Sequence, residues 1–504
     1  MDLSHWIERN AAFHGAKPAI HFEGQDISYV AFDRRIKHLA AALEKGLGIS
    51  PGDRLAHIGH NAPESLDLLF ACARLGAILV PLNWRLAAPE LSYIIKDCSP
   101  SALFAGPEFR STIDSIRDDL SDCRLVGYGG GEGWEDYDDL LEAGGEDGPV
   151  SAGGSETPVL IVYTSGTTGR PKGAVLSQAA IAWNAVNSAH LHDLSSADTV
   201  LTFLPMFHVG GLNIQTTPAL HAGATVIIQR RFEPDAALAA IREHAPSLLV
   251  NVPATMQAML DHPDWAKTDF GCLRVMMTGS TNVPAPLIRA YLDRGVAVGQ
   301  VYGSSETAPI AIVLRGEDGA ARIGSAGTAA LHCEARVVDA AGKDLPNGEP
   351  GEILIRGPNI LSEYWNDAAA TEAALKDGWF HTGDIGIRDA DDYYTIVDRK
   401  KDMIISGSEN VYPAELEAVL AECPAILESA VVGRPDEKWG EVAVAVIVRK
   451  EGHDLEHKDV FGLFEGALAR YKHPRDVVFT ETLPRNVMGK ILKFEIREMV
   501  KGSG

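Results

Sequence analysis

Short apolar runs alternate with segments of helical periodicity between about residues 27 and 260. Residues 65–75 carry apolar side chains at helical spacing, and the apolar run 76–82 that follows predicts a buried strand. Further apolar runs predict strands at 101–106, 158–165, 199–205, 224–229, 247–253 and 273–279. Helix-length stretches such as 233–245 separate these runs. This order of strand, helix and strand is typical of parallel α/β layers.

Two segments depart from this pattern. Residues 127–139 are rich in glycine and acid, which predicts an exposed loop. Residues 331–398 alternate apolar and polar positions, with turn signals at 340–343 and 346–351. Such alternation predicts a smaller antiparallel, β-barrel-like sheet within the same domain.

The charged run at 398–402 precedes a last set of elements. The pattern predicts helices at 410–423 and 459–471 and strands at 428–433 and 441–450. About 100 residues are enough for an α+β domain, and 504 residues exceed what one core usually supports. We therefore expect a large α/β domain at 1–398, with a β-rich subdomain at 331–398, and a small α+β domain at 399–504.

Composition and charge narrow the function classes. The chain has 45 Lys and Arg against 69 Asp and Glu, a net charge of −24, which disfavours nucleic acid and anionic membranes as partners. Six scattered cysteines without a CxxC pair argue against a disulfide framework or a structural zinc site. The amino terminus lacks a signal-peptide pattern, and no apolar run reaches the roughly 18–20 residues of a membrane helix. We expect a cytoplasmic protein without an integral membrane segment, and we leave open whether it forms a homo-oligomer.

A Gly- and Thr-rich segment directly after an apolar run carries the strongest chemical signal. Residues 164–173 read TSGTTGRPKG, with three glycines, four hydroxyl side chains, two cations and no acid. Glycines let backbone N–H groups approach phosphate oxygens, hydroxyls donate to them, and Lys172 supplies positive charge. A flexible connection is the alternative, and the basic residues make it the weaker one. Pro171 stands where a Walker A loop requires glycine, so this is a different phosphate loop.

The segment resembles the phosphate loop of the adenylate-forming superfamily, which contains acyl-CoA synthetases, adenylation domains and firefly-type luciferases. Further motifs of that superfamily follow in order: LPMFHVGG (204–211), VYGSSETA (301–308), GWFHTGD (378–384), DRKKDMIISGSENVYPAELE (398–417) and LPRNVMGK (483–490). The resemblance covers nearly the whole chain and is greatest to bacterial fatty-acyl and aryl CoA ligases.

The resemblance implies a two-step reaction with ATP, Mg²⁺ and coenzyme A. A carboxylate attacks the α-phosphate of ATP to give acyl-AMP and pyrophosphate, and the CoA thiol then displaces AMP. Because an anion attacks a polyanion, cations and oriented donors must stabilise the first step. The resemblance also implies a small C-terminal domain that moves between the two steps.

The resemblance assigns the nucleotide site. It implies that Glu306 holds Mg²⁺ as a hard oxygen ligand and that Tyr302 stacks on adenine. Asp384 and Arg399 would hold the ribose, although Asp384 after a glycine is also a common turn residue. The remaining expected contacts to the nucleotide are Thr164, Ser165, Gly166, Thr167, Thr168, Gly169, Lys172, Gly279, Ser280, Thr281, Gly303 and Ser305.

The resemblance also assigns the catalytic lysine and the hinge. Lys490 would bridge the carboxylate and the α-phosphate, and residues 470–493 carry a net charge of +4 that suits phosphates; a solvated basic patch is the alternative. Asp398 would be the charged, exposed hinge, because Lys490 must leave before CoA arrives. Gly407 and Ser408 would line the thiol tunnel.

The acyl pocket is expected around His208, Val209 and Gly210. A histidine after an apolar strand is usually structural, and here only its motif favours catalysis. Long-chain enzymes of the family usually have glycine where Val301 stands, so we expect short, medium, branched or aryl acids to be favoured over long-chain ones. Two other functions stay open: an enzyme that loads a carrier protein, and a nucleotide-binding module without catalysis.

Overall fold

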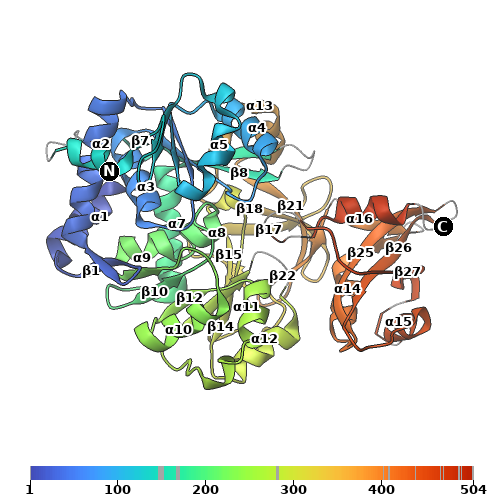
Figure 1. Cartoon of the computed structure of the whole chain (residues 1–504). Helices are drawn as coiled ribbons and strands as arrows, with labels where there is room; N and C mark the ends of the chain where they lie inside the picture. Colours follow the sequence, from blue (N-terminus) through green and yellow to red (C-terminus); the bar gives the residue numbers. More distant parts are fainter. Residues whose placement is uncertain are drawn as a thin grey trace.

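The computed structural model describes residues 2–145, 152–165, 171–279, 283–400, 402–406, 409–436, 439–465, 467–468, 470–485, 489 and 491–501. Within these residues the strands form four sheets. Figure 1 shows a large lobe, coloured blue to yellow, and a smaller orange-to-red lobe beside it. The fold is mixed α/β with a large N-terminal domain, a curled antiparallel sheet and a small C-terminal domain, which confirms the fold class expected from the sequence.

A nine-stranded sheet carries the site described below. Its central strands are parallel, and the strands at both ends are antiparallel to their neighbours. The strand order is β16 (Thr328–Ala329), β15 (Ile312–Leu314), β14 (Val298–Tyr302), β13 (Val275–Gly279), β12 (Leu248–Val250), β10 (Thr199–Thr202), β11 (Thr225–Ile228), β1 (Pro18–Phe22) and β2 (Gln25–Ser28).

A second, eight-stranded sheet is also mainly parallel. Its order is β19 (Glu363–Tyr364), β9 (Pro171–Ser177), β8 (Pro158–Ser165), β4 (Ile78–Leu82), β3 (Arg54–Ile58), β5 (Ala102–Ala105), β6 (Arg124–Gly127) and β7 (Glu135–Asp136). The main core contains residues from both sheets and from helices α1 (Ser4–His14), α2 (Tyr29–Leu47), α3 (Pro63–Leu75) and α7 (Gln178–His192). The two sheets and these helices therefore pack as one unit.

Other helices cover the nine-stranded sheet or connect its strands. They are α8 (Val209–Asn213), α9 (Thr216–Ala222), α10 (Pro234–His244), α11 (Pro253–Leu260) and α12 (Ala285–Leu292). Helices α4 (Ala88–Cys98), α5 (Arg110–Asp114) and α6 (Tyr137–Ala143) belong to the first third of the chain. Helix α13 (Ala368–Ala374) follows β19.

The third sheet is antiparallel and has its own small core around Val337, Ile353 and Tyr394. It contains β17 (Glu334–Val338), β18 (Gly351–Arg356), β20 (Leu375–Lys376), β21 (Trp379–Arg388) and β22 (Tyr394–Arg399). This is the sheet that the alternating pattern of residues 331–398 predicts.

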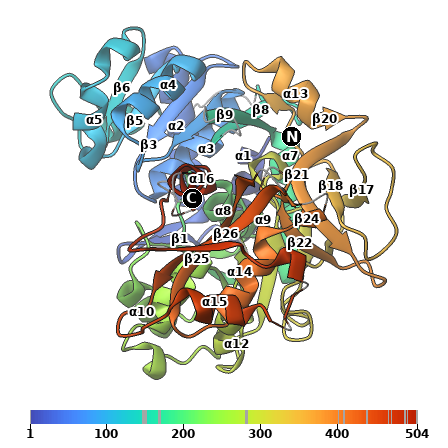
Figure 2. The same ribbon diagram turned by 90° about the vertical axis from the view of Figure 1, so that its right-hand side faces the viewer.

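The fourth sheet forms the small lobe. It contains β23 (Ile404–Ser406), β24 (Glu409–Val411), β25 (Ile426–Asp436), β26 (Gly440–Arg449) and β27 (Asp476–Thr480), with helices α14 (Pro413–Ala421), α15 (His457–Leu463) and α16 (Lys493–Val500). Helix α16 packs on one face of this sheet, and α14 and α15 pack on the other. Figure 2, which views this lobe from its outer side, shows α15 and α16 on opposite sides of β25 and β26.

Two local predictions are wrong. Residues 127–139 are not simply an exposed loop, because β7 and the start of α6 lie there, and Trp134 and Tyr137 are buried. The high glycine content of this segment suggested a loop, although two of its aromatic side chains pack into the interior. The helix expected at 459–471 ends at Leu463, because Phe464 turns into the core of the small lobe and contacts the ring of His473.

No helix among the described residues has the length and apolar character needed to cross a membrane.

Candidate functional site

The carboxyl ends of four neighbouring strands bring several predicted site residues to one edge of the nine-stranded sheet. Strands β10, β12, β13 and β14 are adjacent and parallel, so all four end at the same edge. Tyr302 ends β14, Gly279 ends β13 beside Val301, and His208 follows β10 by six residues. The carboxyl edge of an open parallel sheet is where such folds bind ligands.

Tyr302, Asp384 and Arg399 form a polar cluster where this sheet meets the antiparallel sheet. Tyr302 donates a hydrogen bond of 2.7 Å to Oδ2 of Asp384, and Arg399 Nε lies 2.6 Å from the other oxygen, Oδ1. Asp384 and Arg399 are also register partners in β21 and β22. Burial, and then the carboxylate of Asp384, raises the pKa of Tyr302 well above its usual value, so the phenol remains a donor.

Two glycines of the motifs are required by local geometry. A Cβ at Gly303 would lie 1.6 Å from the carbonyl oxygen of Pro309, which excludes any side chain. Gly383 has a φ of +68°, a conformation that other residues rarely adopt, and it directly precedes Asp384. Gly303 thus allows a close backbone approach three residues before Glu306, and Gly383 allows the turn directly before Asp384.

Glu306 is held by a residue that the sequence motifs did not include. It lies in the 3₁₀ turn η4 (Ser305–Thr307), in which Ser305 is buried. Tyr364 donates a hydrogen bond of 2.8 Å to Glu306 Oε1, and the backbone N–H of Leu361 donates to the Glu306 carbonyl. Burial and the Glu306 carboxylate raise the pKa of Tyr364, which keeps the phenol protonated. The carboxylate is therefore oriented before any cation binds.

Lys172 lies next to the same tyrosine. Strand β9 pairs with β19, placing Tyr364 opposite Ala174, and Lys172 Nζ lies 5.6 Å from the centre of the Tyr364 ring. The lysine also lies 3.4 Å from Asp367 Oδ2. Tyr364 thus connects the strand after the phosphate loop to Glu306. A cation and a carboxylate around one rigid ring can face a metal–phosphate group from two sides.

The described part of the phosphate segment is a hairpin. Thr164 is the register partner of Lys172, and Ser165 is the partner of Pro171. This pairing confirms a strand before the predicted loop and adds a second strand after it. The predicted loop residues Gly166, Thr167, Thr168 and Gly169 lie outside the described residues, as do Ser280, Thr281, Gly407, Ser408 and Lys490.

His208 caps the short helix α8. Its Nδ1 accepts a hydrogen bond of 3.1 Å from the backbone N–H of Gly210, so the proton of the neutral ring is on Nε2. Val209 is buried in this helix, and Val301 is buried in the main core. The cap fixes the direction of the His208 ring.

The residue expected to be an exposed hinge is buried, and on this point the expectation is wrong. Asp398 is 9% exposed, and its two oxygens accept hydrogen bonds from the backbone N–H groups of Arg399 and Ala414. Ala414 lies in the first turn of α14, so Asp398 ties β22 to the small lobe. Burial raises the pKa of the Asp398 carboxyl.

The sequence reasoning missed Tyr364 and Asp367. Both lie in the segment between the motifs at 301–308 and 378–384, and neither has a neighbouring residue pattern that indicates chemistry. Their positions depend on the pairing of β19 with β9, which joins residues almost 190 positions apart. No pattern in the neighbouring sequence predicts a contact between residues so far apart.

Two family models, and several known proteins, match this chain. The model described as "AMP-binding enzyme" matches residues 7–365, and the model described as "AMP-binding enzyme C-terminal domain" matches residues 415–490. The indoleacetate–CoA ligase of Aromatoleum aromaticum is 51% identical over 502 residues, which cover 99% of this chain and 98% of that protein. A feruloyl-CoA synthase of Amycolatopsis sp. is 40% identical over 495 residues, with 98% of each chain covered. The crystal structure of ATP-bound MatB from Rhodopseudomonas palustris superposes with a TM-score of 0.91 at 32% identity, covering 100% of both chains.

Proposed function

Because this chain belongs to the AMP-binding enzyme family, we propose that it activates an aryl carboxylic acid at the site around Tyr302, Glu306 and Asp384. The chain is an ATP-dependent carboxylate–CoA ligase of the AMP-forming type. A carboxylate oxygen attacks the α-phosphorus of ATP and pyrophosphate leaves. The thiol sulfur of CoA then attacks the acyl carbon, and AMP leaves as the thioester forms.

The choice of an aryl acid is supported chiefly by one observation, the 51% identity to an indoleacetate–CoA ligase over nearly the whole of both chains. The feruloyl-CoA synthase adds a second relative that is named for an aryl acid. The residues at the sheet edge are compatible with such a substrate, because Val301 and Val209 are apolar and buried there. We infer that a long aliphatic tail is disfavoured.

For the nucleotide, we propose that Asp384 and Arg399 hold the ribose and that Lys172 contacts the phosphates. The carboxylate of Asp384 can accept hydrogen bonds from two vicinal hydroxyls, and Tyr302 orients it. We propose His208 as the residue beside the acyl carboxylate. Its Nε2 carries the proton and can donate to an oxygen.

Mg²⁺ is part of the same proposal, with Glu306 as its protein ligand. The donor chemistry fits, because Mg²⁺ binds through one or two carboxylates together with substrate phosphates. Among the described residues no group of three His, Cys, Asp or Glu side chains could hold a metal by itself, so phosphate oxygens would complete the shell. Bound there, Mg²⁺ supplies positive charge to the phosphates, and Tyr364 and Lys172 fix the groups around it.

The test is a screen of carboxylic acids with ATP, Mg²⁺ and CoA, in which acyl-CoA is identified by mass and pyrophosphate is measured. The panel should contain indoleacetate, phenylacetate, cinnamates, benzoates and saturated acids from acetate to palmitate. We expect the fastest turnover with an aryl acid. Fastest turnover with palmitate would contradict the aryl proposal, and acyl transfer to a carrier protein but not to CoA would favour the carrier-loading alternative.

A further inference from the structure

Gln215 is a buried amide without a hydrogen-bond partner among the described residues. It lies between α8 and α9 and is 1% exposed. Neither its Oε1 nor its Nε2 is within hydrogen-bonding geometry of a described group. Buried side-chain amides are normally paired, because an unpaired one destabilises the folded protein. The amide therefore requires an explanation that the fold itself does not supply.

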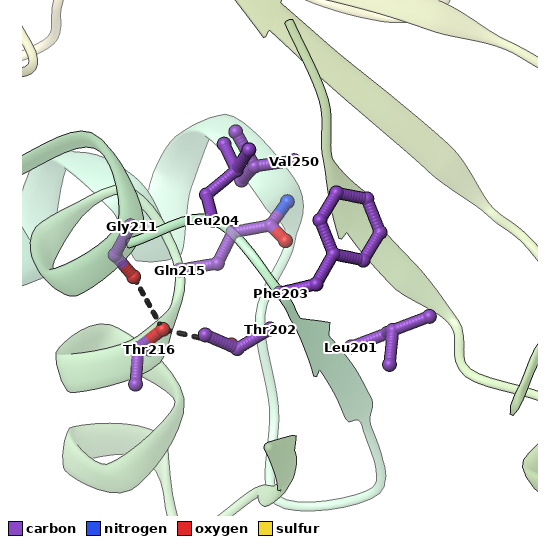
Figure 3. A pocket seen from close by; sticks show the side chains of 8 residues that line it. All are labelled: Leu201, Thr202, Phe203, Leu204, Gly211, Gln215, Thr216 and Val250. Atoms are coloured by element: carbon purple, nitrogen blue, oxygen red, sulfur yellow. Dashed lines mark hydrogen bonds between the residues drawn. The ribbon is translucent and has the colours of Figure 1, made fainter. Parts of the chain in front are cut away.

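The Gln215 side chain points into a cavity. Figure 3 shows its amide extending between Val250 and Phe203. Its enclosed volume is about 10 Å³, measured for the centre of a water molecule, so it has room for about one water-sized group. The lining residues are Leu201, Thr202, Phe203, Leu204, Gly211, Gln215, Thr216 and Val250.

The other polar side chains of this cavity are satisfied. The hydroxyls of Thr202 and Thr216 lie 2.8 Å apart and share a hydrogen bond, and Thr216 also donates to the carbonyl of Gly211. The rest of the lining consists of aliphatic and aromatic side chains. The cavity thus combines an apolar surface with one amide that offers both a donor and an acceptor.

The cavity lies beside the segment that begins at His208. Gly211 lies in α8, which His208 caps, and Gln215 follows His208 by seven residues, two beyond the end of α8 at Asn213. Val250 ends β12 and is the register partner of Met277, two residues before Gly279. The cavity therefore lies at the same carboxyl edge, at the end of β12. Strand β13, which ends at Gly279, is next to β12, and β14, which ends at Tyr302, is the strand after that.

We propose that Gln215 is a specificity residue that hydrogen-bonds a polar group on the ring of the aryl acid, at the end remote from the carboxylate. This inference rests on the proposed function. A ring hydroxyl would satisfy both atoms of the amide, and a ring N–H would satisfy Oε1. The cavity has room for about one water-sized group, far less than a whole ligand needs. It can therefore take the polar atom that the ring carries at its remote end, and the ring itself stays outside it.

The experiment compares pairs of acids that differ in one hydrogen-bonding group. Suitable pairs are 4-hydroxyphenylacetate with phenylacetate, 4-hydroxycinnamate with cinnamate, and indole-3-acetate with 1-benzothiophene-3-acetate. In the wild type, kcat/KM should favour the hydrogen-bonding member of at least one pair by about 10- to 100-fold. Gln215→Met keeps the volume and removes the amide, so it should bring that ratio close to 1 while the apolar acid keeps its rate.

Gln178→Met is the matched control. Gln178 is an equally buried glutamine, but its amide donates to the carbonyl of Ala73 and accepts from the N–H of Leu3. This variant should lower the melting temperature and leave the substrate ratio unchanged. Gln215→Met, in contrast, should not lower the melting temperature of the free enzyme, because no hydrogen bond is lost. Should Gln215→Met fail to fold, Gln215→Asn is the second variant. Its side chain is one methylene shorter, which moves the amide toward the backbone and should reduce the same ratio.

The outcomes separate the two proposals. If the wild type turns over aryl acids but shows no preference within any pair, or if Gln215→Met lowers both members equally, the role of Gln215 is overturned and the aryl proposal stands. If the wild type forms CoA thioesters only from non-aryl acids, the proposed substrate class fails, and the role of Gln215 fails with it.

Discussion

Tyr302 donates a 2.7 Å hydrogen bond to Asp384, and this contact joins the end of β14 in the nine-stranded sheet to β21 in the antiparallel sheet. The two residues are 82 positions apart. Asp384 also pairs with Arg399 at 2.6 Å, so one carboxylate organises an aromatic ring and a cation. The corner that we propose for the nucleotide is thus built from two sheets.

Asp384→Ala should raise the KM for ATP about 10- to 100-fold in ATP–pyrophosphate exchange, because a carboxylate that accepts from ribose hydroxyls is lost and Arg399 is left without its partner. Tyr302→Phe keeps the ring and loses one hydrogen bond, so its effect should stay below about tenfold. An unchanged KM for ATP in Asp384→Ala would refute the ribose assignment. Circular dichroism of both variants checks that the fold is intact.

Glu306→Gln should lower the rate of pyrophosphate release by about 100-fold or more, because the metal loses its carboxylate ligand. The Mg²⁺ concentration that gives half-maximal rate should rise as well. Tyr364→Phe is the control, since it removes only the hydrogen bond that orients Glu306. Its effect on the same Mg²⁺ titration should be less than about tenfold. If both variants show the same Mg²⁺ dependence as the wild type, Glu306 is not the metal ligand.

The sequence predicted most strands and the antiparallel sheet because apolar periodicity and turn residues are local signals. Strand 158–165 and the helix around 234–244 appear where the pattern places them. The motif residues Tyr302, Asp384 and Arg399 do converge, yet their spacing in the chain does not reveal that one carboxylate contacts both partners.

The parts that the sequence did not predict depend on long-range packing. Tyr364 reaches Glu306 only because β19 pairs with β9. Asp398 lies in a charged run that is typical of an exposed hinge. In the structure the N-terminus of α14 covers Asp398 and donates a hydrogen bond to it. In the sequence nothing distinguishes Gln215 from other polar residues. Only the structure shows that its amide is buried and has no hydrogen-bond partner among the described residues.

Two buried histidines should make stability depend on pH. Burial lowers the pKa of His57 to about 4 and that of His192 to about 4, against 6.5 in an exposed chain. Between about pH 6.5 and 4 the unfolded chain binds protons that the folded chain does not, so stability falls as the pH is lowered through this window. Each histidine contributes a slope of at most about 1.4 kcal/mol per pH unit.

Urea unfolding at several pH values between about 4.5 and 7.5 measures this slope. The double variant His57→Gln, His192→Gln should flatten it, while carboxylates continue to contribute the same amount in both proteins. A slope identical to that of the wild type would show that neither histidine is responsible.

Variants of two lysines three residues apart should distinguish an effect on catalysis from an effect on the stability of the small lobe. Lys490 is the residue proposed to bridge the carboxylate and the α-phosphate, so Lys490→Ala should reduce pyrophosphate release by about 100-fold or more. Thioester formation from supplied acyl-AMP and CoA should stay within about threefold of the wild type, because no phosphate transfer remains. Equal rates of adenylation in variant and wild type would contradict the role of Lys490.

Lys493 is the comparison residue. Its Nζ lies 2.9 Å from Glu417 and near Asp398, and these carboxylates raise the pKa of Lys493 although burial opposes its charge. Lys493→Ala should destabilise the protein by about 2 kcal/mol, between the values for exposed and buried ion pairs. It should also slow both half-reactions together, because the contact between α16 and α14 beside Asp398 is lost. If Lys493→Ala impairs adenylation alone, as Lys490→Ala is expected to do, the ion pair with Glu417 serves the chemical step and not the stability of the small lobe.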